Sequence, residues 1–362
     1  MTTPDLALES IRELPKVVLH DHLDGGLRPS TVLELAHEIG HELPADDLEG
    51  LQTWFRDSAD SGSLVSYLET FEHTIAVMQT QDALARVAFE AAEDLARDGV
   101  VYAEIRQAPE LNTAGGLSID QVVAAIQSGY DEASAKYGIV ARQLLCGMRQ
   151  ADRWEETARA VVDFKGYGVV GFDIAGPELG FPPALQASAF EMLRHELCHI
   201  TIHAGEADGL DSIAGALYQG AERLGHGVRI VDDITRDEDG VDGSGWVLGP
   251  LASYVRDRGI ALEVAPTSNL QTGAAGATSI ETHPFGLLAD LGFNVTINTD
   301  NRLMSHTSVS EETWKLVQAF GYDLDDLELF TLNALHAAFL PLPDRMGLIQ
   351  DVILPGYDAL RA

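Results

Sequence analysis

Four short apolar runs in this sequence are each followed closely by a histidine or an aspartate. His20 and His22 close the first run, His203 and His226 close two later ones, and Asp300 follows the last. Because side chains two apart on a β-strand point the same way, His20 and His22 can face one point in space. Several imidazoles and one carboxylate suit zinc in a catalytic site that keeps an open position for water. The sequence therefore predicts a metal site assembled from strand ends.

The rest of the chain alternates short β-branched runs with longer segments of helical period. The predicted strands cover residues 16–20, 100–106, 140–148, 169–174, 200–204, 223–226, 260–264 and 294–298. Eight strands that alternate with helices predict an α/β fold, a closed TIM (β/α)8 barrel. An open doubly wound sheet would need a glycine-rich phosphate loop after the first strand, and that place holds the two histidines instead. No GxGxxG or GxxxxGK[ST] motif occurs, so nucleotide-phosphate chemistry has no local support.

Three predicted helices have clear start and stop signals. They are predicted at residues 31–39, 82–98 and 119–136. Ser30 and Ser118 are the expected N-caps, and Gly40 and Gly99 follow the first two helices. Glycine and proline are spread without a linker that would divide the chain. We therefore expect residues 1–362 to form a single domain.

Residues 28–98 separate the first two predicted strands and are longer than an ordinary crossover. Their pattern is mostly helical, so we expect a helical insertion over the C-terminal mouth of the barrel. Within it, Leu64, Tyr67, Leu68 and Phe71 fall on one helical face. That face either closes over a substrate or joins the core.

Composition narrows the class of partner. A net charge of -34 repels nucleic acid and anionic lipid, which favours a small neutral or cationic ligand, although the same charge also keeps a surface solvated. No apolar stretch approaches a membrane span and residues 1–12 lack a signal-peptide pattern, so we expect no membrane association and a cytoplasmic location. With two cysteines and no CxxC spacing, any metal must use nitrogen and oxygen ligands. The acidic glycine-rich segment 237–245 lacks the ligand spacing of an EF-hand.

A barrel places its functional residues at the C-terminal ends of different strands, where all five candidate groups fall. Any one of these histidines alone would be read as a hydrogen-bonded structural residue. Together, five titratable groups at one end of an apolar barrel would cost several kcal/mol in desolvation. A bound divalent cation offsets that cost.

Five strings of residues, kept in order along the chain, are similar to adenosine deaminases of the bacterial type. The strings are Pro-Lys-Val-Val-Leu-His-Asp-His-Leu-Asp-Gly at 15–25, Gly-Phe-Asp-Ile-Ala-Gly at 171–176, His-Ala-Gly-Glu at 203–206, Gly-His-Gly at 225–227 and Asn-Thr-Asp at 298–300. The resemblance runs from the first predicted strand to the last. It implies a zinc-dependent TIM-barrel hydrolase, with one Zn²⁺ per chain, that converts adenosine and deoxyadenosine to inosine and deoxyinosine with release of ammonia.

The resemblance also implies roles for individual residues. The implied zinc ligands are His20, His22, His203 and Asp300, and zinc would lower the pKa of bound water to about 7. Asp300 would also orient the hydroxide, and His226 would hydrogen-bond it and stabilise the developing charge. Glu206 would donate a proton to purine N1. The implied substrate contacts are His22, Asp24 to a ribose hydroxyl, the Gly176 N–H to N3, and Asn301.

Asn301 departs from the family pattern, in which a second aspartate commonly follows the metal-binding one. An amide can donate to purine N7 without any shift in pKa, so the change is compatible with purine binding. It leaves adenine and enlarged nucleosides such as aminodeoxyfutalosine open as alternative substrates. No basic cluster in the ligand loops suits a 5′-phosphate, which disfavours AMP.

A rival metal motif, HExxH, occurs at 195–199. On one helix His195 and His199 would share a face, and Glu222 could serve as a third ligand, as in a metalloprotease. Against this, the strand predicted at 200–204 begins directly after His199. Polar residues at a frayed helix end are the simpler reading, and a barrel that binds nucleosides without catalysis is a third alternative.

Overall fold

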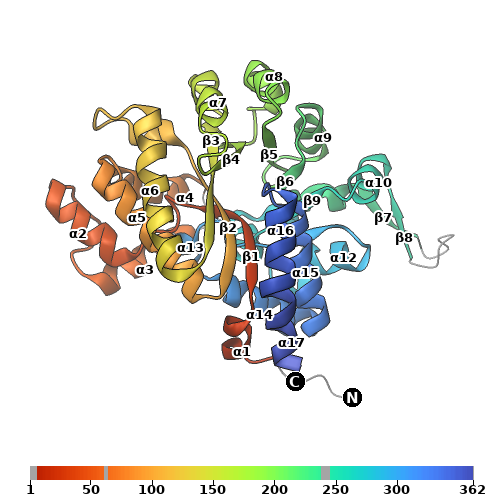
Figure 1. Ribbon diagram of the computed structural model, residues 1–362. Coiled ribbons are helices and arrows are strands. Elements are labelled where there is room, and N and C mark those ends of the chain that lie inside the picture. Colours follow the sequence, from red (N-terminus) through yellow and green to blue (C-terminus); the bar gives the residue numbers. More distant parts are fainter. Residues whose placement is uncertain (1–5, 61–63, 238–244, 362) are drawn as a thin grey trace.

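The computed structural model describes residues 6–60, 64–237 and 245–361, with the backbone alone for residues 64–69. Its centre is an eight-stranded sheet in which all neighbouring strands pair in parallel (Figure 1). The strands, in spatial order, are β1 (Lys16–His22), β2 (Val100–Gln107), β3 (Val140–Met148), β4 (Val169–Ala175), β5 (His199–Ala204), β6 (Arg223–His226), β9 (Ala261–Val264) and β10 (Val295–Ile297). The predicted barrel is confirmed, with all eight predicted strands within a few residues of their bounds.

The last strand meets the first at the end of the barrel that carries the histidines. The Asp300 N–H donates to the His20 carbonyl at 2.9 Å, and the His22 N–H donates to the Asp300 carbonyl at 2.8 Å. Just below, Asn298 Oδ1 accepts from the N–H groups of Leu19 and His20 at 2.8 and 3.0 Å. We call these contacts of β1 with residues 298–300 the closing seam. The side-chain oxygen of Asn298 thus takes the place of a strand carbonyl as acceptor, at the point where backbone pairing with β1 ends.

Helices surround the sheet (Figure 1). Those before residue 260 are α1 (Leu8–Glu13), α5 (Gln81–Arg97), α6 (Ile119–Tyr137), α7 (Trp154–Asp163), α8 (Ala187–His195), α9 (Leu210–Tyr218) and α10 (Pro250–Asp257). Those after it are α11 (Pro266–Thr272), α12 (Pro284–Asp290), α13 (Arg302–Ser305), α14 (Val309–Phe320), α15 (Leu324–Ala337), α16 (Leu342–Leu348) and α17 (Leu354–Arg361).

The long connection between β1 and β2 has two parts. Helices α2 (Pro29–Ile39), α3 (Leu48–Ala59) and α4 (Leu64–Val77) form the expected insertion, and α3 packs against α13, which directly follows the last strand-end residues. By contrast, α5 packs along α6 and β2 as an ordinary crossover helix, so the insertion ends before it. Of the proposed lid residues, Phe71 is half-buried against an apolar cluster that the insertion shares with the barrel. The side chains of Leu64, Tyr67 and Leu68 lie outside the described residues.

The helix ends confirm most of the expected caps. Ser118 caps α6 through a capping box with Gln121, and Gly40 ends α2 in the left-handed conformation at φ 71°. The prediction of Ser30 as an N-cap is wrong, because α2 already begins at Pro29. Proline suits that first helical position, since its fixed φ fits the helix and its missing N–H would have no partner there.

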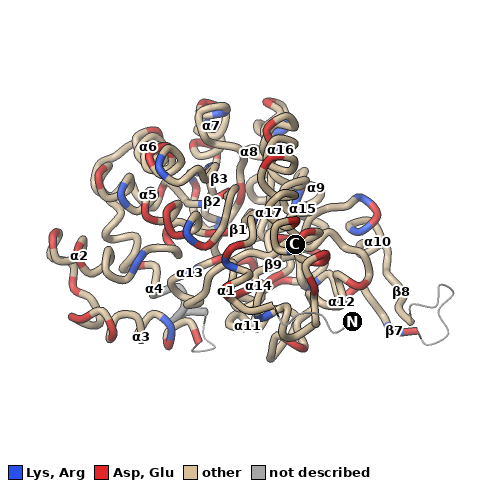
Figure 2. Tube along the Cα trace, turned by 60° about the horizontal axis from the view of Figure 1, so that its bottom comes forward, with Lys and Arg blue, Asp and Glu red and all other residues tan. Residues whose placement is uncertain are grey.

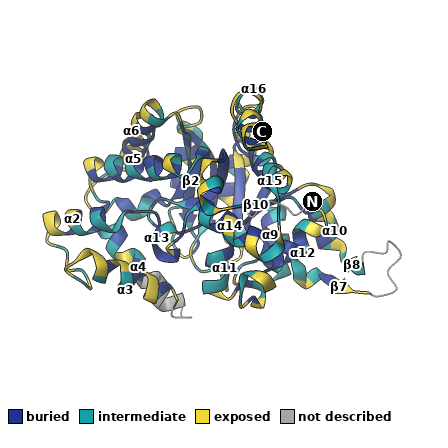
Figure 3. Cartoon of the chain, turned by 90° about the horizontal axis from the view of Figure 1, so that it is seen from below, coloured by how far each residue is buried: buried dark blue, intermediate teal, exposed yellow. Residues whose placement is uncertain are grey.

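Apolar burial fills the space between the sheet and its helices, while the outer helix faces are exposed (Figure 3). One small feature was not expected from the sequence, an antiparallel hairpin of β7 (Ile234–Arg236) and β8 (Trp246–Leu248). It flanks the acidic glycine-rich segment, of which residues 238–244 lie outside the described residues. In the described part of the chain, acidic residues occur on elements all around the barrel (Figure 2). Within the described ranges, none of the helices is long and apolar enough to cross a bilayer.

Candidate metal and catalytic site

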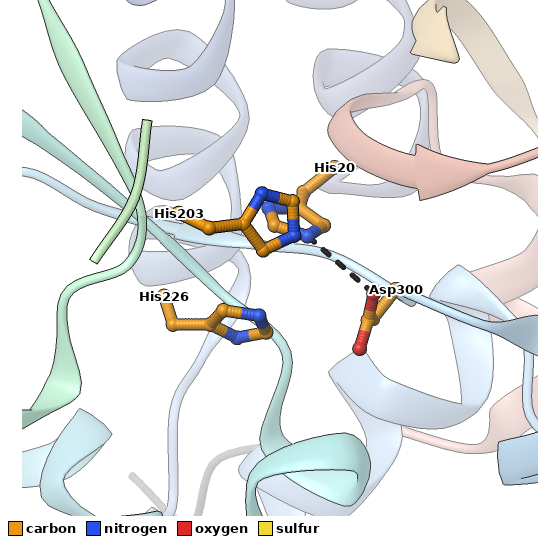
Figure 4. A group of neighbouring side chains, drawn as sticks. All are labelled: His20, His203, His226 and Asp300. Carbon is orange, nitrogen blue, oxygen red and sulfur yellow. Dashed lines mark ion pairs between the residues drawn. The ribbon is translucent and has the colours of Figure 1, made fainter. Parts of the chain in front are cut away.

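The predicted strand-end residues converge on one point (Figure 4). His20, His203, His226 and Asp300 each offer one ligating atom, and these atoms all lie within 4.8 Å of one another. His22, at the end of β1, faces the same point: its Nε2 atom lies 3.3 Å from His203 Nε2 and 3.2 Å from Asp300 Oδ1. Five groups therefore surround one centre, which is one more than a tetrahedral ion requires.

The spacing of these atoms fits zinc. Ligands about 2.0–2.1 Å from a tetrahedral zinc ion lie about 3.3–3.5 Å from one another. The His22–His203 separation and the 3.4 Å between His20 Nε2 and Asp300 Oδ1 match this, and the His22–Asp300 separation of 3.2 Å is slightly shorter. In addition, His20 Nε2 is buried without a hydrogen bond from any described residue, which is unusual for a polar atom in a protein interior. Nitrogen and oxygen donors with an unsatisfied buried nitrogen make this a metal site.

Two buried carboxylates fix the orientation of the histidine rings. His20 Nδ1 lies 3.0 Å from Glu263 Oε2, and His203 Nδ1 lies 2.8 Å from Asp173 Oδ2. Glu263 accepts a hydrogen bond from His20 Nδ1, and Asp173 lies against His203 Nδ1, so each ring turns its Nε2 atom toward the shared centre. Neither carboxylate was singled out from the sequence, since each lies within an ordinary strand.

A charged network fills the barrel beneath these carboxylates. Arg106 donates to Asp173 at 2.5 Å and to Glu263 at 2.6 Å, and all three side chains are fully buried. Arg223 then bridges Glu263 at 2.7 Å to Glu104 at 2.5 Å. The sequence signal for this network is weak but present, because the charged residues interrupt otherwise apolar strands at positions that face inward.

The electrostatics favour neutral imidazoles at His20 and His22, whereas Asp173 raises the pKa of His203 despite its burial. Burial, helped by Arg106 and His203, lowers the pKa of His20 to about 4, and burial holds the pKa of His22 well below its ordinary value. A neutral imidazole keeps the lone pair that a metal needs. Burial opposes ionisation of Asp300, yet its contacts with His20 and His22 hold the pKa of this carboxyl well below its usual range.

Asp300 and His226 have strained backbones. Their φ angles are 57° and 60°, in the left-handed region that non-glycine residues rarely occupy. The Asp300 side chain is held in place by Ser268, whose hydroxyl donates to Oδ2 at 2.5 Å. Such strain persists only where the surroundings over-determine the conformation, and it is frequent at functional sites.

Glu206 lies beside the metal site on the loop after β5. Its Oε2 atom is 3.5 Å from His226 Nε2, and its side chain is 20% exposed, so a ligand can reach it. The loop is held by the buried carboxylate of Glu178, which accepts the backbone N–H groups of residues 205 to 208 at 2.6, 3.1, 2.7 and 2.9 Å. Glu178 was not among the residues singled out from the sequence.

The proposed substrate contacts lie at the same end of the barrel. Asp24 Oδ1 lies 3.9 Å from His22 Nδ1, and burial raises the pKa of Asp24 to about 6. Asn301 packs tightly over Gly25, where a Cβ atom would lie only 2.0 Å from Asn301 Oδ1. Gly176 directly follows β4 with φ 96°, a conformation that suits glycine.

The HExxH motif does not form a metal site. His195 is the last residue of α8 and its side chain is 84% exposed, whereas His199 begins β5 and pairs with Glu222 at 3.0 Å. Because the helix ends between the two histidines, they cannot share a helical face. The metalloprotease alternative is therefore wrong.

Comparisons with known proteins agree with this geometry. The curated adenosine deaminase 1 of Streptomyces coelicolor is 56% identical over 98% of this chain and 90% of its own length. Two solved structures share the fold. One is an adenine deaminase from Arthrobacter aurescens, with a TM-score of 0.82 at 22% identity over 96% of this chain and all of its own. The other is an amidohydrolase from Burkholderia ambifaria with bound zinc, with a TM-score of 0.81 at 26% identity over 98% and 93%.

The adenine deaminase is too distant in sequence to indicate more than a shared fold. The family profile described as adenosine deaminase matches residues 15–355, which is nearly the whole chain and includes every strand of the barrel. This chain therefore belongs to the adenosine deaminase family.

Proposed function

We propose that this chain hydrolyses adenosine and 2′-deoxyadenosine to inosine and 2′-deoxyinosine, consuming one water and releasing one ammonia. The observation that carries the proposal is the convergence of three histidines and an aspartate, with Glu206 beside them, in a chain of this family. High identity to curated adenosine deaminases over nearly the full length supports adenosine over adenine as the substrate.

One zinc ion per chain, held by His20, His22, His203 and Asp300, is the cofactor that we propose. When bound, zinc lowers the pKa of a coordinated water to about 7 and so supplies the nucleophile at neutral pH. The separations among the four ligand side chains and the buried, unsatisfied His20 Nε2 support this assignment.

Each remaining residue then meets one need of the reaction. Attack at purine C6 moves electron density onto N1, and a protonated Glu206 donates its proton there as C6 becomes tetrahedral. His226 Nε2, which lies 3.5 Å from Glu206, hydrogen-bonds the attacking oxygen and stabilises its developing charge. These two side chains act on opposite ends of the C6–N1 bond, so proton donation and charge stabilisation occur together.

Three further groups orient the nucleoside. The Asn301 amide donates to N7 and the Gly176 N–H donates to N3, so hydrogen bonds recognise the purine at both of these atoms. Asp24 accepts a hydrogen bond from a ribose hydroxyl, and His22 contacts the substrate alongside its role as ligand. A free base would leave Asp24 buried without its partner, which favours a nucleoside over adenine.

The test is the loss of adenosine absorbance, measured with and without a strong zinc chelator. Glu206→Gln should lower kcat by about 10²–10⁴, the usual range for loss of a general acid. His195→Ala serves as a matched control at an exposed histidine and should leave turnover unchanged. Full activity of Glu206→Gln, or of a metal-free enzyme, contradicts the proposal. A substrate panel that includes adenine and aminodeoxyfutalosine tests the alternatives, and faster turnover of either than of adenosine overturns the substrate assignment.

A further inference from the structure

A chain of buried hydrogen bonds ends on the far side of His226 from the metal site. Asn269 Nδ2 lies 3.0 Å from His226 Nδ1, and His283 Nε2 lies 3.3 Å from Asn269 Oδ1. The chain begins at the Phe285 N–H, which donates to His283 Nδ1 at 3.0 Å. All three polar side chains are at least 97% buried, so water does not compete for these bonds.

The first link determines the direction of every other link. A backbone N–H can only donate, so His283 Nδ1 accepts and the proton of this neutral ring lies on Nε2. Burial, helped by His226, lowers the pKa of His283 to about 4, which keeps the ring neutral at pH 7. His283 Nε2–H therefore donates to Asn269 Oδ1, and the Asn269 amide donates to His226 Nδ1.

We propose that Asn269 and His283 are positioning residues that hold His226 in the tautomer with its proton on Nε2. His226 Nδ1 is then an acceptor facing Asn269, and Nε2–H is a donor facing Glu206 and the attacking oxygen. The inference rests on the proposed function, in which His226 must donate at that atom.

The same tautomer resolves which of the five converging groups hold the metal. A nitrogen that carries a proton has no lone pair to give, and His226 Nδ1 already accepts from Asn269. His226 is therefore outside the ligand set, although one of its ring nitrogens lies within 4.8 Å of the ligating atoms of His20, His203 and Asp300. The remaining four groups are His20, His22, His203 and Asp300.

The direct test is nitrogen NMR of the zinc-loaded enzyme labelled with ¹⁵N-histidine. Its His226 signals are assigned by their loss in His226→Gln. We expect an unprotonated Nδ1 and a protonated Nε2. A protonated Nδ1, or a metal-bound Nε2, overturns the proposal without the need for any further variant. Failure of the proposed function is seen separately, as absence of zinc binding or of adenosine turnover in the wild-type enzyme.

Asn269→Asp tests the link itself. A carboxylate can only accept, so it should draw a proton onto His226 Nδ1, which NMR reports. We expect kcat to fall by about 10²-fold or more, as when a catalytic histidine loses its correct tautomer, with little change in KM. Asn112→Asp makes the same change at another buried asparagine, whose amide donates to the Met78 carbonyl, and should leave the His226 signals and kcat unchanged. An unchanged His226 spectrum in Asn269→Asp contradicts the proposal.

A second variant, His283→Asn, tests the proposal independently if Asn269→Asp folds poorly. His283→Asn retains an acceptor for the N–H groups at the start of α12 but lacks the Nε2–H donor. We expect both tautomers of His226 in this variant and a smaller loss of kcat. A purely structural role predicts lower stability with the wild-type His226 signals intact, and that result overturns the proposal.

Discussion

At the scale of single residues, the site depends on tight contacts behind the groups that react. Asn301 lies directly over Gly25, on the loop that follows the two histidines of β1. The close approach exists because glycine has no Cβ atom. The position of the amide that we assign to purine N7 therefore depends on the absence of a side chain at Gly25.

Gly25→Ala should displace that amide. A Cβ atom at this position would lie 2.0 Å from Asn301 Oδ1, so the side chain must move. We expect KM for adenosine to rise by about tenfold, equivalent to about 1.4 kcal/mol of lost binding, with a smaller effect on kcat. Steady-state kinetics measure both constants. Gly347→Ala, where an added Cβ meets nothing within 4 Å, is the matched control and should behave as wild type.

The role of a residue could be predicted from the sequence only where the residue follows a predicted strand. His20, His203 and Asp300 follow apolar runs, and a parallel barrel brings such ends together. Glu263 and Asp173, which orient the rings, are charged residues inside otherwise apolar strands, and the sequence does not show which side chains they contact. His283 follows no predicted strand, and its link to His226 passes through Asn269 and depends on three-dimensional contact alone.

At the scale of elements, the loop between β5 and α9 is held by one carboxylate. Glu178 accepts four backbone N–H groups and the Ser212 hydroxyl, and these bonds lower its pKa despite burial. Glu206 is part of this loop. The position of the proposed proton donor thus follows from a residue on a different connection of the barrel.

Glu178→Gln should loosen this loop, because an amide accepts with one oxygen instead of two. We expect the unfolding free energy to fall by about 3 kcal/mol at pH 7, in line with the loss of hydrogen bonds to a charged group, and kcat to fall with it. The pKa of Glu178 is lower in the folded chain than its ordinary value of 4.5, so its stabilisation is complete above that pH. It is lost as the pH falls through the folded-state pKa.

Urea titrations at several pH values check this. The difference between wild type and Glu178→Gln should shrink as the pH falls below about 4.5. Glu191→Gln, at an exposed position of α8, should change stability by less than about 0.5 kcal/mol at every pH. A Glu178→Gln difference that is independent of pH would show that the carboxylate is not ionised in the folded chain.

Helices and strands could be predicted from the sequence where a local residue pattern is enough to specify the element. Parallel strands buried on both faces read as short apolar runs, and the α6 capping box is visible in the order Ser118 to Gln121. The hairpin of β7 and β8 has strands of three residues each, too short for a period to be recognised. The division of residues 28–98 into insertion and crossover was also hidden, because α4 and α5 are both helical and differ only in what they pack against.

At the scale of the whole molecule, the closing seam and the metal site share residues. His20 and Asp300 join the first strand to the residues after the last one, and both are proposed ligands. A metal bound there stabilises only the closed barrel. Removal of zinc should therefore abolish turnover and lower the melting temperature. For binding at about a thousand times Kd the loss is about 4 kcal/mol, or about 5 °C for a chain of this size.

Calorimetry with and without chelator measures that shift, and zinc returned in excess should restore both the melting temperature and the activity. Magnesium, which prefers oxygen ligands, is the matched control and should restore neither. If the melting temperature does not respond to the chelator while activity is lost, the metal does not bind across the seam.

The same measurement tests whether the chain is one domain, as we propose for residues 1–362. One apolar cluster joins the insertion to the barrel, since Leu35 of α2 and Phe55 of α3 belong to it together with Val18 of β1 and Ile105 of β2. An insertion that shares its core with the strands cannot unfold while the barrel stays intact without exposing those strands to water. We therefore expect a single calorimetric transition whose calorimetric and van't Hoff enthalpies agree, shifted as a whole by zinc. Two transitions, with only one of them sensitive to zinc, would place the insertion in a domain of its own.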